Sequence, residues 1–161
     1  PVVFLEHKKT YRLVRGEVPD NEYVLPIGKA DVKRLGSNVT VVSYGLMVHY
    51  CLEAAEALES EGISVEVIDL RTLKPLDTDT ILESVKKTAK LLIVHEANLT
   101  CGVGAEVAAL VADEAFEYLD GPITRLCGED IPAMPFAITL EEAYMPNTVK
   151  VSEALRKLAA Y

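Results

Sequence analysis

The stretch Leu91 to Val111, LLIVHEANLTCGVGAEVAALV, decides the fold of this chain. It opens with four apolar residues, ending at Val94, that do not alternate with polar ones. Such a run is typical of a strand buried on both faces. Two glycines, Gly102 and Gly104, then precede a helical pattern. A strand of this kind needs helices on both sides of its sheet, so the rest of the chain has to supply them.

Strands and helices alternate on either side of this stretch. Their spacings are too long for hairpins and are typical of parallel crossovers. We therefore predict a three-layer αβα sandwich around a mostly parallel sheet. The expected strands are Val39–Tyr44, Ser64–Asp69, Leu91–Val94 and Ile123–Cys127, and the expected helices carry Met47 to Leu58, Asp77 or Thr78 to about Lys87, Val103 to about Tyr118, Leu140–Met145 and Asn147–Tyr161.

The chain before Val39 has a less regular pattern. Val2–Glu6 is a short apolar stretch that predicts a strand, and the polar residues His7–Glu22 indicate a linker. Tyr23–Ile27 predicts a second brief strand, which Pro26 confines to the edge of a sheet. Because the chain starts directly at an apolar strand, we expect it to be part of a longer protein.

Composition limits the classes of protein. A chain of 161 residues, half of them hydrophobic, is expected to form one domain. The net charge of −9 and the pI near 4.8 argue against nucleic acid and anionic membrane surfaces as partners. A basic partner fits better, although acidic charge often serves solubility alone. The cysteines Cys51, Cys101 and Cys127 form no C-x-x-C pair, which favours a reduced intracellular protein. No apolar run is long enough for a transmembrane span.

The candidate ligand site comprises His95, Glu96, Gly102 and Gly104. Ligands of open α/β sheets usually bind where strands end, and an imidazole beside a carboxylate could transfer protons there. Glycines before a helix can also admit a phosphate. However, Val107 stands where a third glycine would be expected, so a structural helix entry is the favoured interpretation. For His95 and Glu96, hydrogen bonding within the fold is favoured over catalysis. No P-loop or serine-nucleophile elbow is present.

Several stretches are together similar to one known family: VIDLRTLKPLD (67–77), HEANLT (95–100) and GEDIPAMPF (128–136). They resemble the carboxyl-terminal part of the beta subunit of the thiamine-diphosphate-dependent decarboxylating component of 2-oxo acid dehydrogenase complexes. The resemblance covers essentially all 161 residues. HEANLT and GEDIPAMP look closer to the branched-chain (2-oxoisovalerate) type than to the pyruvate or acetoin types, which remain the alternatives.

The resemblance implies a fold like the carboxyl-terminal domain of transketolase, with five strands of which the first is antiparallel. Tyr23–Ile27 would be that antiparallel edge strand. Residues 1–8 would be the last strand of a missing domain that binds the cofactor's pyrimidine. Residues 9–38 would be linker and edge strand, and residues 39–161 the domain itself.

The resemblance also implies chemistry that this stretch does not perform alone. The whole enzyme would bind thiamine diphosphate and Mg²⁺ and would oxidatively decarboxylate 2-oxo acids, passing the acyl group to lipoyl groups. Asp120-Gly121 lacks the first glycine of the family's metal motif. We therefore assign no catalytic, cofactor-binding or metal-binding residue, and we expect the fragment alone to be inactive.

The implied role of this stretch is assembly and partner docking. The implied partners are an alpha subunit, a second beta subunit in a heterotetramer of two alpha and two beta chains, and the basic subunit-binding domain of the acyltransferase core. The candidate docking residues are Glu129, Asp130 and the carboxylate of Tyr161, since opposite charges steer such encounters. An ordinary polar loop at Glu129 and Asp130, and a small-ligand regulatory module, remain the alternatives. The expected location is the bacterial cytoplasm or the mitochondrial matrix.

Overall fold

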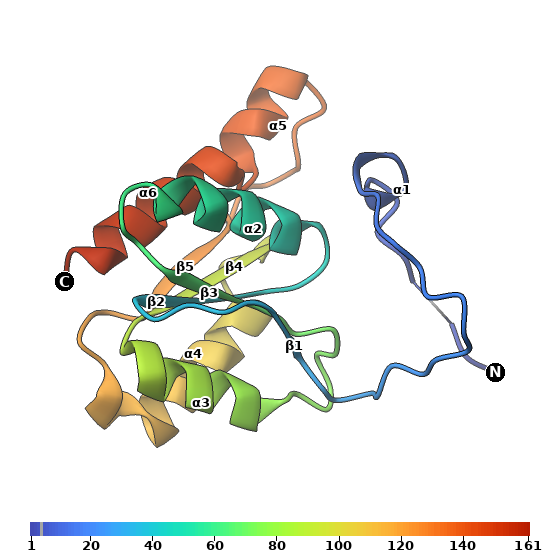
Figure 1. Cartoon of the computed structure of the whole chain (residues 1–161). Helices are drawn as coiled ribbons and strands as arrows, with labels where there is room; N and C mark the ends of the chain where they lie inside the picture. Colours follow the sequence, from blue (N-terminus) through green and yellow to red (C-terminus); the bar gives the residue numbers. More distant parts are fainter. Residues whose placement is uncertain (4) are drawn as a thin grey trace.

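The computed structural model describes residues 1–3 and 5–161 and contains a five-stranded sheet in the order β1-β3-β2-β4-β5 (Figure 1). The strands are β1 (Asp31–Arg34), β2 (Val39–Ser43), β3 (Val65–Asp69), β4 (Leu91–Asn98) and β5 (Thr124–Gly128). The helices are α1 (Thr10–Leu13), α2 (Leu46–Glu59), α3 (Thr78–Thr88), α4 (Val103–Glu114), the 3-10 helix η1 (Phe116–Tyr118), α5 (Ile138–Tyr144) and α6 (Thr148–Ala159).

The sheet has the predicted mixed topology. β2, β3, β4 and β5 run parallel, while β1 pairs antiparallel with β3 at the edge. In the middle of the sheet Val41 of β2 aligns with Val67 of β3 and with Leu92 of β4. The three-layer α/β prediction is therefore confirmed.

Helices cover both faces of the sheet, with α2 and α6 on one side and α3 and α4 on the other (Figure 1). Central strand β4 contributes to both layers. Leu92 and Val94 pack in the core beneath α2 and α6, whereas Leu91 and Ile93 pack beneath α3 and α4. All four are at most 2% exposed. Each such side chain contributes about 1.5–3 kcal/mol by burial, which explains why this strand is apolar on both faces.

The antiparallel edge strand lies later in the chain than predicted. Tyr23–Ile27 forms no strand, and the edge strand is β1, Asp31–Arg34, within the charged segment before β2. An edge strand has one neighbour and a solvent-facing side, so alternating charged residues suit it better than an apolar run. Asp31 also forms ion pairs with Lys33 at 2.6 Å and Arg71 at 2.5 Å.

The amino-terminal segment lacks the predicted strand. Val2, Val3 and Leu5 are 83–92% exposed and belong to no strand, while Phe4 lies outside the described residues. The predicted linker contains a short helix, α1, whose four residues include none that is buried. A strand requires a partner for its backbone hydrogen bonds, and no described residue pairs as a strand with Val2, Val3, Leu5 or Glu6.

Candidate functional site

His95 lies at the end of the buried part of β4 and is 1% exposed. Its Nδ1 lies 3.0 Å from the carbonyl oxygen of Ala97, and the backbone N–H of Gly104 donates to its Nε2 at 3.0 Å. Because a carbonyl only accepts and an amide N–H only donates, Nδ1 carries the proton and Nε2 carries none. The ring is a neutral imidazole that satisfies a free N–H in the first turn of α4.

The imidazole lies directly against two glycines at the start of α4, Gly102 at its N-cap and Gly104 in its first turn. A Cβ atom on Gly104 would lie 2.6 Å from Nε2 of His95. A Cβ atom on Gly102 would lie 2.8 Å from Cε1 of His95 and would overlap the carbonyl oxygen of Asn98. The favoured interpretation of a structural helix entry therefore has a physical reason: these glycines admit a histidine ring.

Cys127 is the third member of this buried group. Its Sγ lies 3.3 Å from Nε2 of His95, and it is 8% exposed. Burial raises the pKa of the Cys127 thiol to about 11. Burial also lowers the pKa of His95 below its ordinary value, and the positive charge of Arg125 lowers it further, although the hydrogen bond to Ala97 acts in the opposite direction. The pair is a neutral thiol beside a neutral imidazole, so Cys127 is not an activated nucleophile.

Glu96 is separated from the rest of the candidate ligand site. It accepts a hydrogen bond at 2.9 Å from Nε2 of His7 and faces a surface groove of about 590 Å³. The groove is also lined by Tyr44, whose ring stacks on His95 with the centroids 6.0 Å apart. The structure thus brings His95, Gly102 and Gly104 together as close packing and directs Glu96 outward. The principal grooves formed by the described residues are not lined by those three.

The neutral state of His95 predicts a pH dependence of stability. The folded protein binds a proton at His95 less readily than the unfolded chain, whose histidine titrates near 6.5. The stabilisation that the neutral His95 contributes to the free energy of unfolding is therefore fully present above about pH 6.5. It is lost as the pH falls through the lower pKa that His95 has in the folded state. Urea denaturation between pH 7.5 and 5.5 should show a smaller loss of stability in His95→Gln than in the wild type. His49→Gln is the control, and equal losses in His95→Gln and the wild type would contradict the assignment.

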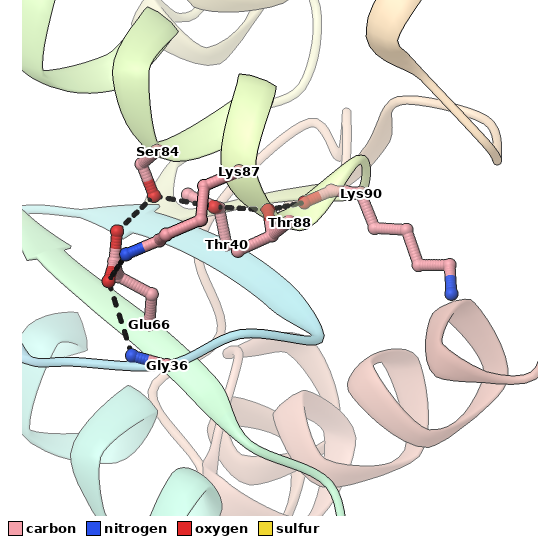
Figure 2. Close-up of polar contacts among 7 residues, drawn as sticks. All are labelled: Gly36, Thr40, Glu66, Ser84, Lys87, Thr88 and Lys90. Carbon is pink, nitrogen blue, oxygen red and sulfur yellow. Dashed lines mark hydrogen bonds and ion pairs between the residues drawn. The ribbon is translucent and has the colours of Figure 1, made fainter.

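A second polar group, not anticipated from the sequence, lies under α3 (Figure 2). The carboxylate of Glu66 on β3 is 3% exposed and accepts hydrogen bonds from Oγ of Ser84 at 2.5 Å and from the N–H of Gly36 at 3.2 Å. It also pairs with the ammonium of Lys87. Oγ1 of Thr40 continues the chain of hydroxyls, 2.6 Å from Oγ of Ser84. One buried carboxylate therefore connects the segment before β2, strand β3 and helix α3.

The charged state of Glu66 follows from these contacts. Burial alone would raise its pKa, but the hydrogen bonds from Lys87, Ser84 and the N–H of Gly36 outweigh burial, so the pKa lies below its ordinary value. Ser84 and Lys87 have the S-x-x-K spacing found in some acylating enzymes. Here Ser84 is 4% exposed, and the principal grooves of the described chain do not reach it. We assign the cluster to structure.

The candidate docking residues lie at opposite ends of the sheet. Glu129 and Asp130 follow the carboxyl end of β5, where Asp130 accepts hydrogen bonds from the N–H and hydroxyl of Thr100. Tyr161 instead packs beside Gly121, before β5 begins, where a Cβ on Gly121 would lie 3.3 Å from Cβ of Tyr161. Five strand residues span about 16 Å, so the two sites cannot form one contact point.

Negative charge is concentrated in one part of the chain. Residues 91–149 carry ten acidic residues and one basic residue, Arg125, so this part accounts for the whole net charge of −9. The exposed 3-10 helix η1 carries Phe116, 73% exposed, between Glu114 and Glu117 in the sequence. Asp120, further along, is next to Gly121, beside which Tyr161 packs. We call this region the η1 surface; it comprises Asp113, Glu114, Phe116, Glu117, Asp120 and Tyr161, all of them exposed.

Neither a metal-binding cluster nor a membrane-spanning helix occurs in the described part of the chain. Within residues 1–3 and 5–161, no group of three or more His, Cys, Asp or Glu side chains is arranged to hold a metal ion. None of the helices in this part of the chain is both long and apolar enough to cross a bilayer.

The chain is similar to known proteins over most of its length. The family model described as the transketolase carboxyl-terminal domain matches residues 28–151. The 2-oxoisovalerate dehydrogenase subunit beta of Bacillus subtilis is 53% identical over 161 residues, which are 100% of this chain and 49% of that protein. The pyruvate dehydrogenase E1 component subunit beta of the same organism is 47% identical, with the same coverage. The acetoin:2,6-dichlorophenolindophenol oxidoreductase subunit beta of Cupriavidus necator is 47% identical, over 98% of this chain and 46% of that protein.

A solved structure gives the same result. A split-gene transketolase described as an inactive beta4 tetramer matches with a TM-score of 0.74 and 29% identity, over 90% of this chain and 46% of that one. The chain spans about half the length of the curated relatives it matches. Its similarity to them extends over almost all of its own residues, through the central strand, the histidine and the glycines described above.

Proposed function

The chain belongs to the transketolase carboxyl-terminal domain family, and on that premise we propose that it is the assembly and docking domain of the beta subunit of a 2-oxo acid dehydrogenase. The whole enzyme would oxidatively decarboxylate branched-chain 2-oxo acids. The observation that carries this proposal is the 53% identity to a 2-oxoisovalerate dehydrogenase beta subunit over every residue of the chain. The same role in a pyruvate or acetoin enzyme is the alternative, supported by relatives at 47% identity.

The interior chemistry supports an assembly role. His95 forms hydrogen bonds with the backbone of Ala97 and Gly104 and with the thiol of Cys127, and Glu66 has three partners within the fold. Thiamine diphosphate and Mg²⁺ would therefore be held by other parts of the enzyme, with the fragment alone binding neither and remaining inactive. Residues 1–8 would be the last strand of the pyrimidine-binding domain, residues 9–38 the linker with its edge strand, and residues 39–161 the domain described here. The exposed Val2, Val3 and Leu5 support that division, because a strand removed from its sheet would look this way.

The surface supports contacts with other subunits. The loop after β5 and helix α5 expose large apolar side chains, with Phe136 fully exposed and Ile138 72% exposed. Contiguous exposed apolar residues mark interaction sites. An alpha subunit and a second beta subunit would cover such surfaces in a heterotetramer. Gel filtration and analytical ultracentrifugation of the beta chain, alone and with its alpha chain, test this directly.

The η1 surface is the better candidate for docking the basic subunit-binding domain of an acyltransferase. It combines four carboxylates, the exposed ring of Phe116 and the exposed Tyr161, which packs beside Gly121. Aromatic residues, phenylalanine among them, are enriched at protein–protein interfaces. Asp130, by contrast, uses its carboxylate to bind Thr100, which reduces what it can offer to a partner. We therefore place docking at the η1 surface and keep Glu129 and Asp130 as the competing location.

Charge reversal distinguishes the two locations. We expect the pair Glu117→Lys and Asp120→Lys, in the full-length beta subunit, to weaken binding of the isolated subunit-binding domain roughly tenfold or more at low salt. Raised salt should narrow that difference, because exposed charges are screened. Calorimetric titration provides the measurement, and Glu56→Lys on the exposed face of α2 is the matched control. If Glu129→Lys and Asp130→Lys weaken binding instead, docking lies at the other end of β5.

A further inference from the structure

Helix α5 is attached to the domain by its ends rather than by its faces. None of its seven residues is buried, and Leu140 in its middle is 59% exposed. In the described chain no other helix or strand packs extensively against it. Figure 1 shows it projecting beyond α6, at the end of the loop that leaves β5. Met145, directly after α5, packs against the core beneath α2 and α6, so the position of the helix depends on contacts at its ends and not on burial of its own faces.

The strongest of these contacts comes from Lys150, in the first turn of α6. Its Nζ donates to the carbonyl oxygens of Ala143 at 2.5 Å, Met145 at 2.9 Å and Glu142 at 3.5 Å. These are carbonyls at the carboxyl end of α5, which have no partner within the helix. The negative end of a helix dipole also favours a cation at this place. A single ammonium group thus binds the end of α5 to the start of α6.

Two other contacts hold the ends of the same segment. The hydroxyl of Tyr144 lies so close to Gly128 that a Cβ there would overlap it. At the other end Asp130 binds Thr100 through two hydrogen bonds. Between these ends the chain from Ile131 to Leu140 is exposed at every position except Pro135.

We propose that the segment from Glu129 to Met145, with α5 in its carboxyl-terminal half, is a surface strap whose position is determined by Lys150. Loss of the Lys150 ammonium frees α5 while the rest of the domain stays folded. Lys150 is then a positioning residue, because it holds the exposed surface of α5 in place without being part of that surface.

Helix α6 should keep its structure when the Lys150 side chain is removed. The backbone N–H of Lys150 remains bonded to Oδ1 of Asn147 at 3.0 Å, which caps the helix independently of the ammonium. Val151, Leu155 and Leu158 anchor α6 in the core and are at most 2% exposed. The effect of a substitution at Lys150 should therefore remain local to α5.

The test is amide hydrogen exchange of the full-length protein with Lys150→Met. We expect the amides of residues 140–145 to exchange roughly tenfold faster than in the wild type, as loss of charge-assisted hydrogen bonds implies. Chymotrypsin should cleave correspondingly faster at Phe136, Leu140 and Tyr144. The urea midpoint of the whole domain should stay unchanged. Lys157→Met, at the exposed far end of α6, is the matched control, and Lys150→Arg should restore part of the protection.

Two outcomes would overturn the proposal. Unchanged exchange in α5 would show that Lys150 does not hold it, and a parallel fall in global stability would show that α5 is not a separate unit. The consequence for subunit contacts rests on the proposed function and is measured separately, by sedimentation of the variant with its partner subunits. Faster exchange with unaltered assembly would preserve the strap and count against an interface at α5.

Discussion

Replacing Gly102 or Gly104 by alanine is expected to lower the free energy of unfolding by about 2–3 kcal/mol, as overpacking of a well-packed interior does. A methyl group on Gly104 would lie 2.6 Å from Nε2 of His95 and 3.2 Å from Cγ2 of Ile93. Neither neighbour can withdraw, because Ile93 is buried in the core and the imidazole is bonded on both sides. Urea denaturation at pH 7.5 provides the measurement.

The two substitutions should respond differently to removal of the imidazole. At Gly104 the nearest obstacles belong to the ring, so His95→Ala should relieve much of the cost of Gly104→Ala in a double-mutant cycle. At Gly102 the carbonyl oxygen of Asn98 remains in the way, so the cost should persist. Gly16→Ala is the control, because nothing lies within 4 Å of that position. Additive effects at Gly104 and His95 would contradict the packing described here.

The parallel core could be predicted from the sequence because its signals are local. The apolar run of β4 and the cap of α3 each depend on neighbouring residues. Asp77 indeed caps α3, accepting from the backbone N–H of Thr80 at 3.5 Å and from Oγ1 of the same residue at 2.9 Å. The same carboxylate also accepts from the N–H of Ala30 at 3.0 Å, a contact 47 residues distant in the chain. That second bond holds the segment before β1, and no local pattern announces it.

The edge strand was predicted wrongly for a related reason. Tyr23–Ile27 is the more apolar segment, but strand formation at an edge depends on which backbone reaches β3. Gly36 decides this, because it lies so close to Val65 and Glu66 that any Cβ would overlap their backbone. The close approach places the residues just before it, Asp31–Arg34, alongside β3.

In the candidate sites too, the placement of residues close in sequence could be predicted, whereas the placement of residues far apart in sequence could not. The proximity of His95 to Gly102 and Gly104 could be predicted, since a short turn joins them. The separation of Glu129 and Asp130 from Tyr161 could not, because it depends on where α6 ends relative to β5. The Glu66 cluster was also missed. Its signal was an acidic residue within the mostly apolar strand VEVID (65–69). The partners of Glu66 on α3, Ser84 and Lys87, lie 18 and 21 residues further along the chain, so no local pattern connects them.

Replacing Glu66 by glutamine is expected to lower the free energy of unfolding by about 2 kcal/mol at pH 7. Breaking a buried ion pair usually costs roughly 3–5 kcal/mol. The smaller figure allows for Lys87, whose side chain is 46% exposed, so that water can solvate its ammonium once the partner is neutral. The amide of glutamine also donates where the carboxylate accepted, so Ser84 or the N–H of Gly36 loses its acceptor.

The difference between Glu66→Gln and the wild type should disappear in acid. The folded-state pKa of Glu66 is below its ordinary value, so the unfolded chain binds the proton more readily. The stabilisation is complete above the ordinary value of about 4.5 and is lost as the pH falls through the folded-state pKa. Denaturation curves from pH 7 to 3 should therefore converge for the two proteins. Glu83→Gln, exposed on the same helix as Ser84, should stay parallel to the wild type. A constant gap for Glu66→Gln down to pH 3 would show that shape, and not charge, makes the carboxylate stabilising.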